Sequence, residues 1–590
     1  MSIEQLEELC RVIRKEIISI TKENGGHMGS NLGSIETIVA MHYVFDCPLD
    51  KFIFDVGHQC YTHKFLTGRY DIMKNLHKDS GTTGFPNRCE SEYDEFMAGH
   101  ASTSLSASIG IASARDLSHE DFYVLNLVGD GSMSGGMIYE ALNNLKQFRK
   151  FIVILNDNGM SISNSVGTVQ KHLSKLLSSR GGIITRNKVK WFFQKLRMNF
   201  VTRILKKMVS ACFNNNLFEE FGLQYIGVVD GHNLNEIITT FKNVKKYSHN
   251  KPVIIHIKTK KGNGYKEAEE DKYKMHSAGN KSSAQKNKTY GNIFGETILQ
   301  MAESDNRIVA ITAAMESSVG LANFAERFPD RFFDVGIAEE HAVTFAAGLA
   351  CQGLKPYFAV YATFLQRAFD QMYHDVSLQN LPVRFIVDKI GVPGGDGKTH
   401  AGLYDMSMFN NFYNFRVLSP LDERDLVQAI HFSSEYSDGP LVIRYPKKHP
   451  IEITYEKYNN MNVVRRGEKY LVICSASCMT DTINALLYLN IFDSSTIVHL
   501  YDNKYNIQYI AEMINSHNKT IFIDDCCFYG SCANLLKNMY EDDRQSLLHK
   551  TFFVAPGSEP VGKIQIESQL AEYGLDMHGI ARQISHIINI

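Results

Sequence analysis

Apolar runs that alternate with helical patterns constrain the fold of this chain more than any other feature of its sequence. Two of these runs, FYVLNLV (122–128) and FIVIL (151–155), are separated by a segment long enough for one helix. Two parallel strands need a crossover connection of this kind, and sheets built from such units are buried on both faces. The pattern repeats over most of the length. It predicts an α/β fold in which each domain is a mostly parallel sheet with helices on both faces.

The chain has 590 residues, which exceeds what one hydrophobic core supports. The polar stretch NKSSAQKNK (280–288) is typical of a linker and ends a first block. A second block reaches the strand pattern PLVIRYP (440–446), and a third contains EKYLVICSAS (468–477). We therefore predict three domains, at residues 1–288, 289–455 and 456–590.

Charge and cysteine usage narrow the class of protein. The formal net charge is −2, so we expect neither a nucleic acid nor a membrane surface as a partner. The start of the chain, MSIEQLEELCRVIRKEI, is charged and amphipathic and lacks the apolar segment of a signal peptide. The eleven cysteines form no paired CxxC sets, which favours free thiols in a reducing cytosol over zinc ligands. We expect a cytoplasmic protein.

Polar residues follow both of the first two apolar runs directly, as GDG (129–131) and NDN (156–158). The carboxylate of Asp130 and the amide oxygen of Asn158 are ligands that Mg²⁺ accepts, with phosphate oxygens and water completing its octahedron. Glycines let the backbone approach a phosphate closely. With a helix expected from Met133 to Phe148, the segment predicts a magnesium-bound diphosphate and resembles the thiamine diphosphate motif. A capping Asp in an ordinary strand–turn–helix is the alternative.

Thiamine diphosphate also needs a carboxyl group on its pyrimidine ring, because that ring generates the reactive carbanion. The segment RFFDVGIAEEHAVTFAAGLACQG (331–353) offers Glu339, which follows an expected strand and opens a helix of small and apolar residues. Taken alone, an acidic pair at a helix N-terminus is better explained by helix electrostatics.

Further motifs add to these two, among them GGHMGSNLG, DVGHQCYTHKFLTGR, LNDNGMSIS, TKKGNGY, YATFLQRAFDQ and GGDGKTH. Together they make the chain similar to the 1-deoxy-D-xylulose-5-phosphate synthase family of the transketolase superfamily. The resemblance spans nearly the whole chain and weakens after about Arg465. It implies a transketolase-like fold and a homodimer. It also implies a transferase that condenses pyruvate with D-glyceraldehyde 3-phosphate to 1-deoxy-D-xylulose 5-phosphate and CO₂, the first step of non-mevalonate isoprenoid synthesis and a supply for thiamine synthesis.

The resemblance implies roles around thiamine diphosphate and Mg²⁺. The metal ligands it implies are Asp130, Asn158 and the backbone carbonyl of Met160. The other residues it places at the diphosphate and the thiazolium are His58, Gly99, His100, Ala101, Gly131, Ser132, Ile162 and Tyr265. Glu339 matches the glutamate that activates the pyrimidine, Phe364 would stack on that ring, and Tyr361 and Arg367 lie nearby.

Four histidines fit the substrate pocket that the resemblance implies, and histidine titrates near the working pH. They are His27, His58, His276 and His400. Asp396 would position the substrate or a histidine. A phosphorylated acceptor needs a cationic clamp, and Arg444 in VIRYP matches one family arginine.

Two positions depart from the family on the acceptor side. Lys389 in DKIG stands where the family has the Arg of DRAG, and Ala401 stands where the family has the Gln of THQG. Lys keeps the charge but loses the planar fork that binds phosphate bidentately. In the third block, which mainly builds the dimer in the family, Asp524 and Asp525 stand in place of a Glu pair.

These departures leave an alternative open, namely a related pyruvate-decarboxylating carboligase that uses a different aldehyde or ketone acceptor. A catalytically silent paralogue that only binds thiamine diphosphate or a partner protein is disfavoured, because Glu339, Asp130 and the histidines are all present.

Overall fold

The computed structural model describes residues 1–159, 217–248, 250–271, 275, 288–392, 394–531, 547, 549–562 and 564–589. The chain forms two compact units, Met1–Ala284 and Gln285–Ile590. Each unit is described by itself. Three of the residues singled out in the sequence, Met160, Ile162 and His276, lie outside the described ranges.

The first unit contains a five-stranded sheet of order β1-β2-β3-β5-β4, in which every neighbouring pair is parallel. Its strands are β1 (Lys51–Phe54), β2 (Val124–Gly129), β3 (Phe151–Asp157), β4 (Gln224–Asp230) and β5 (Val253–Lys258). Its helices are α1 (Ile3–Asn24), α2 (Met28–Val44), α3 (Tyr61–Leu66), α4 (Tyr70–Met73), α5 (Ser104–Leu117), α6 (Gly136–Asn143), α10 (Leu217–Glu220), α11 (Leu234–Tyr247) and α12 (Lys266–Glu270).

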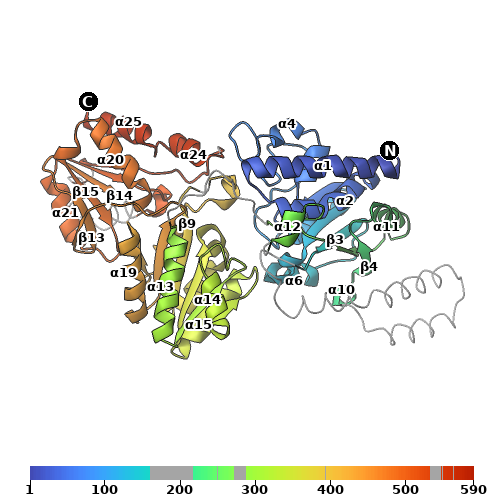
Figure 1. Ribbon diagram of the computed structural model, residues 1–590, viewed down its shortest axis with the longest axis horizontal. Helices are drawn as coiled ribbons and strands as arrows, with labels where there is room; N and C mark the ends of the chain where they lie inside the picture. Colours follow the sequence, from blue (N-terminus) through green and yellow to red (C-terminus); the bar gives the residue numbers. More distant parts are fainter. Residues whose placement is uncertain are drawn as a thin grey trace, which may run out of the picture. The chain divides into compact units, whose positions relative to one another are not determined.

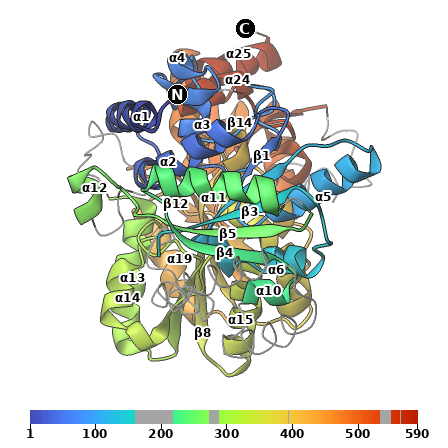
Figure 2. The same cartoon turned by 90° about the vertical axis from the view of Figure 1, so that its right-hand side faces the viewer.

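Side chains of this sheet alternate between two hydrophobic clusters, because successive residues of a strand point to opposite faces. Leu125 and Leu127 join the cluster formed with α1, α2 and α11, and Figure 2 shows α11 next to the strands of this sheet. Val124 and Val128 join the opposite cluster, formed with α5, α6 and α10. Helices therefore cover both faces, as the unbroken apolar runs predict.

The helix that connects β2 to β3 is shorter than expected. The expected helix from Met133 to Phe148 was wrong at both ends: a 3₁₀ turn, η1, occupies Asp130–Ser134, and α6 covers only Gly136–Asn143. Gly135 is extended and starts α6, while Asn144 ends it. Asparagine side chains compete with the helix for backbone hydrogen bonds, and this explains the early end.

The second unit contains two sheets (Figure 1). The first of them is wholly parallel, with the order β10-β11-β9-β8-β6-β7. Its strands are β6 (Ile308–Thr312), β7 (Phe332–Asp334), β8 (Lys355–Tyr361), β9 (Arg384–Ile390), β10 (Arg416–Leu418) and β11 (Leu441–Pro446). Its helices are α13 (Tyr290–Ser304), α14 (Ala322–Arg327), α15 (Glu339–Cys351), α16 (Ala362–Leu365), α17 (Phe369–Gln371), α18 (Asp405–Phe409) and α19 (Glu423–Glu435).

The last sheet has the order β12-β13-β15-β14-β16-β17 and is antiparallel only at β12–β13 and β13–β15. Asn459 and Asn460 both have positive φ, which is the geometry of a two-residue hairpin turn. The strands are β12 (Glu456–Tyr458), β13 (Met461–Arg465), β14 (Tyr470–Cys474), β15 (Ser495–Leu500), β16 (Lys519–Ile523) and β17 (Thr551–Val554). The helices are α20 (Met479–Tyr488), α21 (Ile507–Ser516), α24 (Ile566–Tyr573) and α25 (Met577–Ile588).

The predicted fold class is confirmed, since three mostly parallel sheets alternate with helices along the chain. The division into three domains, with boundaries after residues 288 and 455, stays a prediction. Within the described ranges, no helix combines the length and the apolar character that crossing a bilayer requires.

Candidate active site

Two strand tips of the first unit bring Asp130 and Asn158 together. Strands β2 and β3 are parallel neighbours, with Gly129 opposite Asn156. The backbone N–H of Asn158 donates to Oδ1 of Asp130 at 3.4 Å, and Asp130 is buried. The two strand tips are therefore adjacent, as the GDG and NDN spacing predicts, while the role of Asp130 and Asn158 as metal ligands stays a prediction.

The loop that carries Gly99, His100 and Ala101 is fixed by Asp55, which follows β1. Asp55 is buried and accepts hydrogen bonds from the backbone N–H groups of Ser102 at 2.9 Å and Ser104 at 3.2 Å. The hydroxyl of Ser102 donates to the carbonyl of Ser132 at 2.8 Å. The GHAST loop and the turn with Gly131 and Ser132 therefore form one hydrogen-bonded assembly around the two strand tips.

Lys261 is a residue that the sequence analysis missed. It is buried at 4% exposure, and burial lowers the pKa of its ammonium group to about 8, against the opposing effect of Asp130. A buried cation beside a buried carboxylate suits an anionic ligand such as a diphosphate. Lys261 lies in the motif KKGNGY, of which the family resemblance singles out only Tyr265.

Tyr265 has neighbours of its own in the structure. Lys22 of α1 lies 4.5 Å above its ring, and its hydroxyl donates to Glu267. Tyr265 also starts α12 as the residue before its first turn. Its assignment to the diphosphate stays a prediction.

His27 and His58 are neighbours, with ring centroids 5.4 Å apart. The fully buried amide of Asn31 joins their backbones, because its Nδ2 donates to the carbonyls of both His27 and His58 at 2.7 Å. Oδ1 of Asn31 accepts from the N–H of Tyr61 at 3.0 Å, and the hydroxyl of Tyr61 accepts from the N–H of His27 at 3.1 Å. Burial lowers the pKa of His58 well below its ordinary value, and His27 and Lys261 add to this shift. His58 is therefore neutral at pH 7.

In the second unit, Glu339 is the first residue of α15 and is 1% exposed. Burial raises the pKa of its carboxyl group to about 7, and Arg367, whose Nη1 lies 3.5 Å from Oε2, opposes that rise. At neutral pH the carboxyl group is therefore protonated in about half of the molecules. A carboxylic acid of this kind can donate a hydrogen bond to a ring nitrogen, and an ionised carboxylate cannot.

Aromatic rings and a loop histidine gather in the same unit. The ring of Phe364 stacks with Tyr361 at 5.9 Å and meets His400 edge-on at 5.5 Å. His400 ends η6 (Gly397–His400), which Asp396 starts. Burial lowers the pKa of His400, and Asp396 opposes that shift.

Lys389 belongs to this group, with Nζ 3.6 Å above the ring of Tyr361. Burial acts to lower the pKa of Lys389, but Tyr361 and Asp388 outweigh it, so the pKa is raised and the side chain stays charged. Direct contacts thus connect four residues that were predicted from three motifs, namely Tyr361, Phe364, Lys389 and His400.

Arg444 lies within β11, and acidic side chains contact its guanidinium. Nε donates to Oδ2 of Asp405 at 2.6 Å, and Nη2 donates to Oδ1 at 3.3 Å. Nη2 also lies 3.7 Å from Oδ1 of Asp525 and 3.0 Å from Sγ of Cys526. In this structure the guanidinium of Arg444, which the sequence analysis assigned to a phosphate, therefore binds the carboxylate of Asp405.

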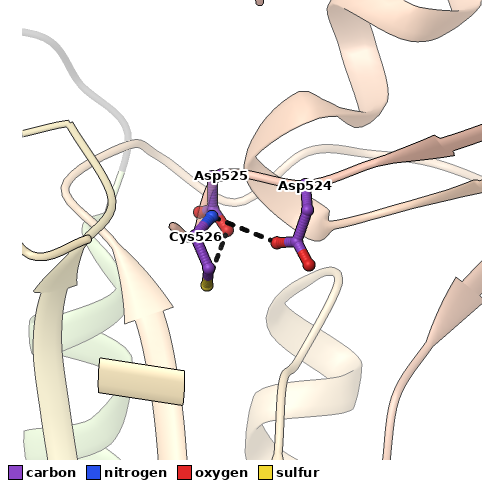
Figure 3. A group of neighbouring side chains, drawn as sticks. All are labelled: Asp524, Asp525 and Cys526. Atoms are coloured by element: carbon purple, nitrogen blue, oxygen red, sulfur yellow. Dashed lines mark hydrogen bonds between the residues drawn. The ribbon is translucent and has the colours of Figure 1, made fainter. Parts of the chain in front are cut away.

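Asp524, Asp525 and Cys526 place their potential ligand atoms within 4.8 Å of one another (Figure 3). Burial and Asp525 raise the pKa of Asp524 to about 7. Burial also acts to raise the pKa of Asp525, but Arg444 outweighs it and the pKa is lowered. Because the guanidinium already supplies the positive charge, we interpret the cluster as an ion-pair network and not as a metal site.

The residues fit thiamine diphosphate and Mg²⁺ by their chemistry. The first unit offers hard oxygen donors and a buried cation, as a metal-bound diphosphate requires. The second offers the buried carboxyl group of Glu339 with a raised pKa, and elsewhere the aromatic ring of Phe364, which are the chemical types that the pyrimidine requires. Fold and residues together define an enzyme of the transketolase type that depends on thiamine diphosphate.

Comparison with known proteins identifies the family. Residues 1–259 match the family model of 1-deoxy-D-xylulose-5-phosphate synthase, and residues 286–450 match that of the transketolase pyrimidine-binding domain. The synthase of Caldanaerobacter subterraneus subsp. tengcongensis is 40% identical over 99% of this chain and 96% of its own. That of Dictyoglomus thermophilum is 39% identical over 100% and 97%, respectively. The chain belongs to the 1-deoxy-D-xylulose-5-phosphate synthase family.

Among solved structures, the transketolase of Campylobacter jejuni subsp. jejuni is similar at 17% identity and a TM-score of 0.44, over 99% of this chain and 100% of its own.

Proposed function

We propose that the chain condenses pyruvate with D-glyceraldehyde 3-phosphate, releasing CO₂ and forming 1-deoxy-D-xylulose 5-phosphate. The observation that carries this function is the full-length similarity to curated synthases. The buried carboxyl group of Glu339 and the paired strand tips at Asp130 and Asn158 support it. Thiamine diphosphate, when bound, supplies the carbon nucleophile for this reaction.

The first unit holds the charged end of the cofactor. Asp130 and the side chain of Asn158 would ligate Mg²⁺, together with the carbonyl of Met160 that the family resemblance adds. Lys261 balances the negative charge of the diphosphate from a buried position. Gly131 and Ser132, with the loop that Asp55 fixes, place backbone groups beside the diphosphate.

Glu339 acts on the pyrimidine. Its raised pKa keeps a proton available on the carboxyl group at neutral pH, so the group could donate a hydrogen bond to the ring nitrogen of the bound cofactor. Phe364 would stack on the same ring, and Arg367 limits how far the pKa of Glu339 rises.

The histidines move protons during addition and carboligation. Burial lowers the pKa of both His58 and His400, which keeps both rings neutral near pH 7 and able to accept a proton. His27 lies against His58, and we assign it to the same task. His276 completes the set by family resemblance alone.

The cations that we assign to the acceptor phosphate differ from those of the family, because Lys389 replaces an arginine. Lys389 remains charged above Tyr361 and is the cation that we assign to the phosphate, and Asp396 positions the substrate or His400. Arg444 contributes from its buried position beside Asp405. Lys389 and Ala401 are also the observations that favour the second candidate, a carboligase with another aldehyde or ketone acceptor.

We further propose Mg²⁺ as the metal, a homodimer, a cytoplasmic location and the three-domain division at 288 and 455. The nine cysteines within the described ranges are all free thiols, which supports a reducing compartment. The oxygen donors around Asp130 support Mg²⁺ over softer metals.

The decisive experiment incubates the purified protein with Mg²⁺, thiamine diphosphate and pyruvate, with and without D-glyceraldehyde 3-phosphate. CO₂ release and product mass are followed together. Acceptor-dependent CO₂ and a deoxyxylulose phosphate product are expected. CO₂ release that ignores this acceptor would move the assignment to the second candidate.

A further inference from the structure

The loop that carries Asp396 and His400 packs against the part of the second unit that contains the last sheet. This loop, residues 391–404, follows β9 and is named here the GDGKTH loop. Gly391 lies so close to Asp525 that an added Cβ would stand 3.0 Å from its Oδ2. The N–H of Cys527 donates to the carbonyl of Leu403 at 2.8 Å, and the hydroxyl of Tyr404 donates to the carbonyl of Ser558 at 2.8 Å.

The most specific of these contacts joins Gln569 to Gly394. Oε1 of Gln569 accepts from the N–H of Gly394 at 3.0 Å, and Nε2 donates to the carbonyl of the same residue at 3.4 Å. Gln569 lies on α24 and is 1% exposed. A primary amide is the side-chain group that can satisfy the N–H and the C=O of one residue together, as a neighbouring strand would.

The backbone of Gly394 fits this contact closely. Its φ is +77°, and an added Cβ would lie 2.7 Å from Cγ1 of Ile566, the first residue of α24. Helix α24 therefore contacts the loop through a buried amide and an apolar side chain, two residues before Asp396 and six before His400.

We propose that Gln569 is a positioning residue for the acceptor side of the site: it holds the GDGKTH loop through Gly394 and so sets where Asp396 and His400 meet the acceptor. This rests on the proposed function. It gives the last part of the chain, which the family resemblance connects mainly with dimerisation, a second task within its own subunit.

Gln569→Met tests the proposal, because Met fills a similar volume and makes neither hydrogen bond. Glu572→Met is the matched control, since Glu572 is exposed on the same helix. We expect Gln569→Met to raise the KM for glyceraldehyde 3-phosphate about fivefold to tenfold, within the range expected when the loop loses the net contribution of its anchoring hydrogen bonds. The KM for pyruvate and the Kd for thiamine diphosphate should stay within about twofold of the wild type.

Amide hydrogen exchange, followed by mass spectrometry, supplies a readout that needs no turnover. The peptide containing Gly394 should exchange about tenfold faster in Gln569→Met and unchanged in Glu572→Met, since the N–H of Gly394 loses its acceptor. Unchanged exchange in Gln569→Met would overturn the proposal. So would faster exchange with an unchanged acceptor KM, or an equal weakening of acceptor, pyruvate and cofactor binding, which indicates a general structural role.

Turnover by the wild type distinguishes failure of the proposed function from failure of the proposed role of Gln569. If the wild type fails to condense the two substrates, the proposed function is wrong and the role of Gln569 toward this acceptor is wrong with it. If the wild type condenses them and Gln569→Met matches it, only the positioning role is wrong.

Discussion

Asp405 holds Arg444 through two hydrogen bonds, from Nε to Oδ2 at 2.6 Å and from Nη2 to Oδ1 at 3.3 Å. Both side chains are buried, and burial acts to lower the pKa of Arg444, but Asp405, Cys526 and Asp525 outweigh it and raise the pKa well above its ordinary value. The guanidinium is permanently charged and its orientation is set by a carboxylate. A phosphate that reaches Arg444 must use Nη1, whose contact is Ser419 Oγ at 3.4 Å.

Asp405→Asn should therefore impair both stability and acceptor binding. Removing one partner of a buried ion pair leaves an uncompensated charge and costs about 3 to 5 kcal/mol. We expect a lower Tm and a higher KM for glyceraldehyde 3-phosphate, measured by calorimetry and steady-state kinetics. Asp502→Asn is the control, because Asp502 is also buried and pairs with Arg416 at 2.6 Å. It should lower the Tm and leave the KM unchanged. An equal KM change in both variants would contradict a specific role for Asp405.

Glu339→Ala should abolish turnover and leave the fold intact, because we assign the carboxyl group to activation of the cofactor. CO₂ release and circular dichroism check the two parts of this expectation. Glu340→Ala, at the next position of the same helix, should retain most of the activity. Near-normal carboligation by Glu339→Ala would refute the assignment of Glu339.

The raised pKa of Glu339 also predicts a pH dependence of stability in the cofactor-free protein. Below about pH 4 the carboxyl group is protonated in both the folded and the unfolded chain and contributes nothing. As the pH rises from about 4.5 to about 7, the unfolded chain ionises first, so the folded state loses stability, on the order of 3 kcal/mol in full. Glu339→Gln lacks this loss. Its Tm advantage over the wild type should therefore grow between pH 5 and pH 8, and an advantage that is constant with pH would show that the pKa is not raised.

Lys261→Met should weaken thiamine diphosphate binding, because it removes a buried cation beside Asp130. Hydrogen bonds to charged groups contribute about 1.5 to 3 kcal/mol, so the Kd should rise by about one to two orders of magnitude. Titration calorimetry with Mg²⁺ present measures it. Lys260→Met is the neighbouring control, since Lys260 is exposed and pairs with Glu269. A Kd that is equal in both variants would remove Lys261 from the diphosphate site.

Lys389→Arg should lower the KM for glyceraldehyde 3-phosphate, because the planar fork adds a second hydrogen bond to the phosphate. Steady-state kinetics with varied acceptor will show the change. An unchanged or higher KM would mean that Lys389 serves Tyr361, whose ring lies 3.6 Å from Nζ, and does not face the phosphate.

Local patterns in the sequence determined the strands and helices of the fold and the kinds of side chain at the candidate active site. The apolar runs predicted buried parallel strands, and the GDG and NDN tips placed Asp130 beside Asn158, because neighbouring strands and turns are short-range consequences of residue order. The family motifs likewise predicted that Tyr361, Phe364, Lys389 and His400 belong to one active site.

Only the tertiary structure decided the contacts between segments that are distant in sequence. Asp405 and Arg444 are 39 positions apart in the chain, and Asp130 and Lys261 are 131 apart. Gly394 and Gln569, which form the hydrogen bonds between the loop and α24, are 175 positions apart. Burial and partner choice depend on how whole elements pack, and no local pattern encodes them. For the same reason the pKa values of Glu339 and His58 follow from their surroundings and not from their motifs.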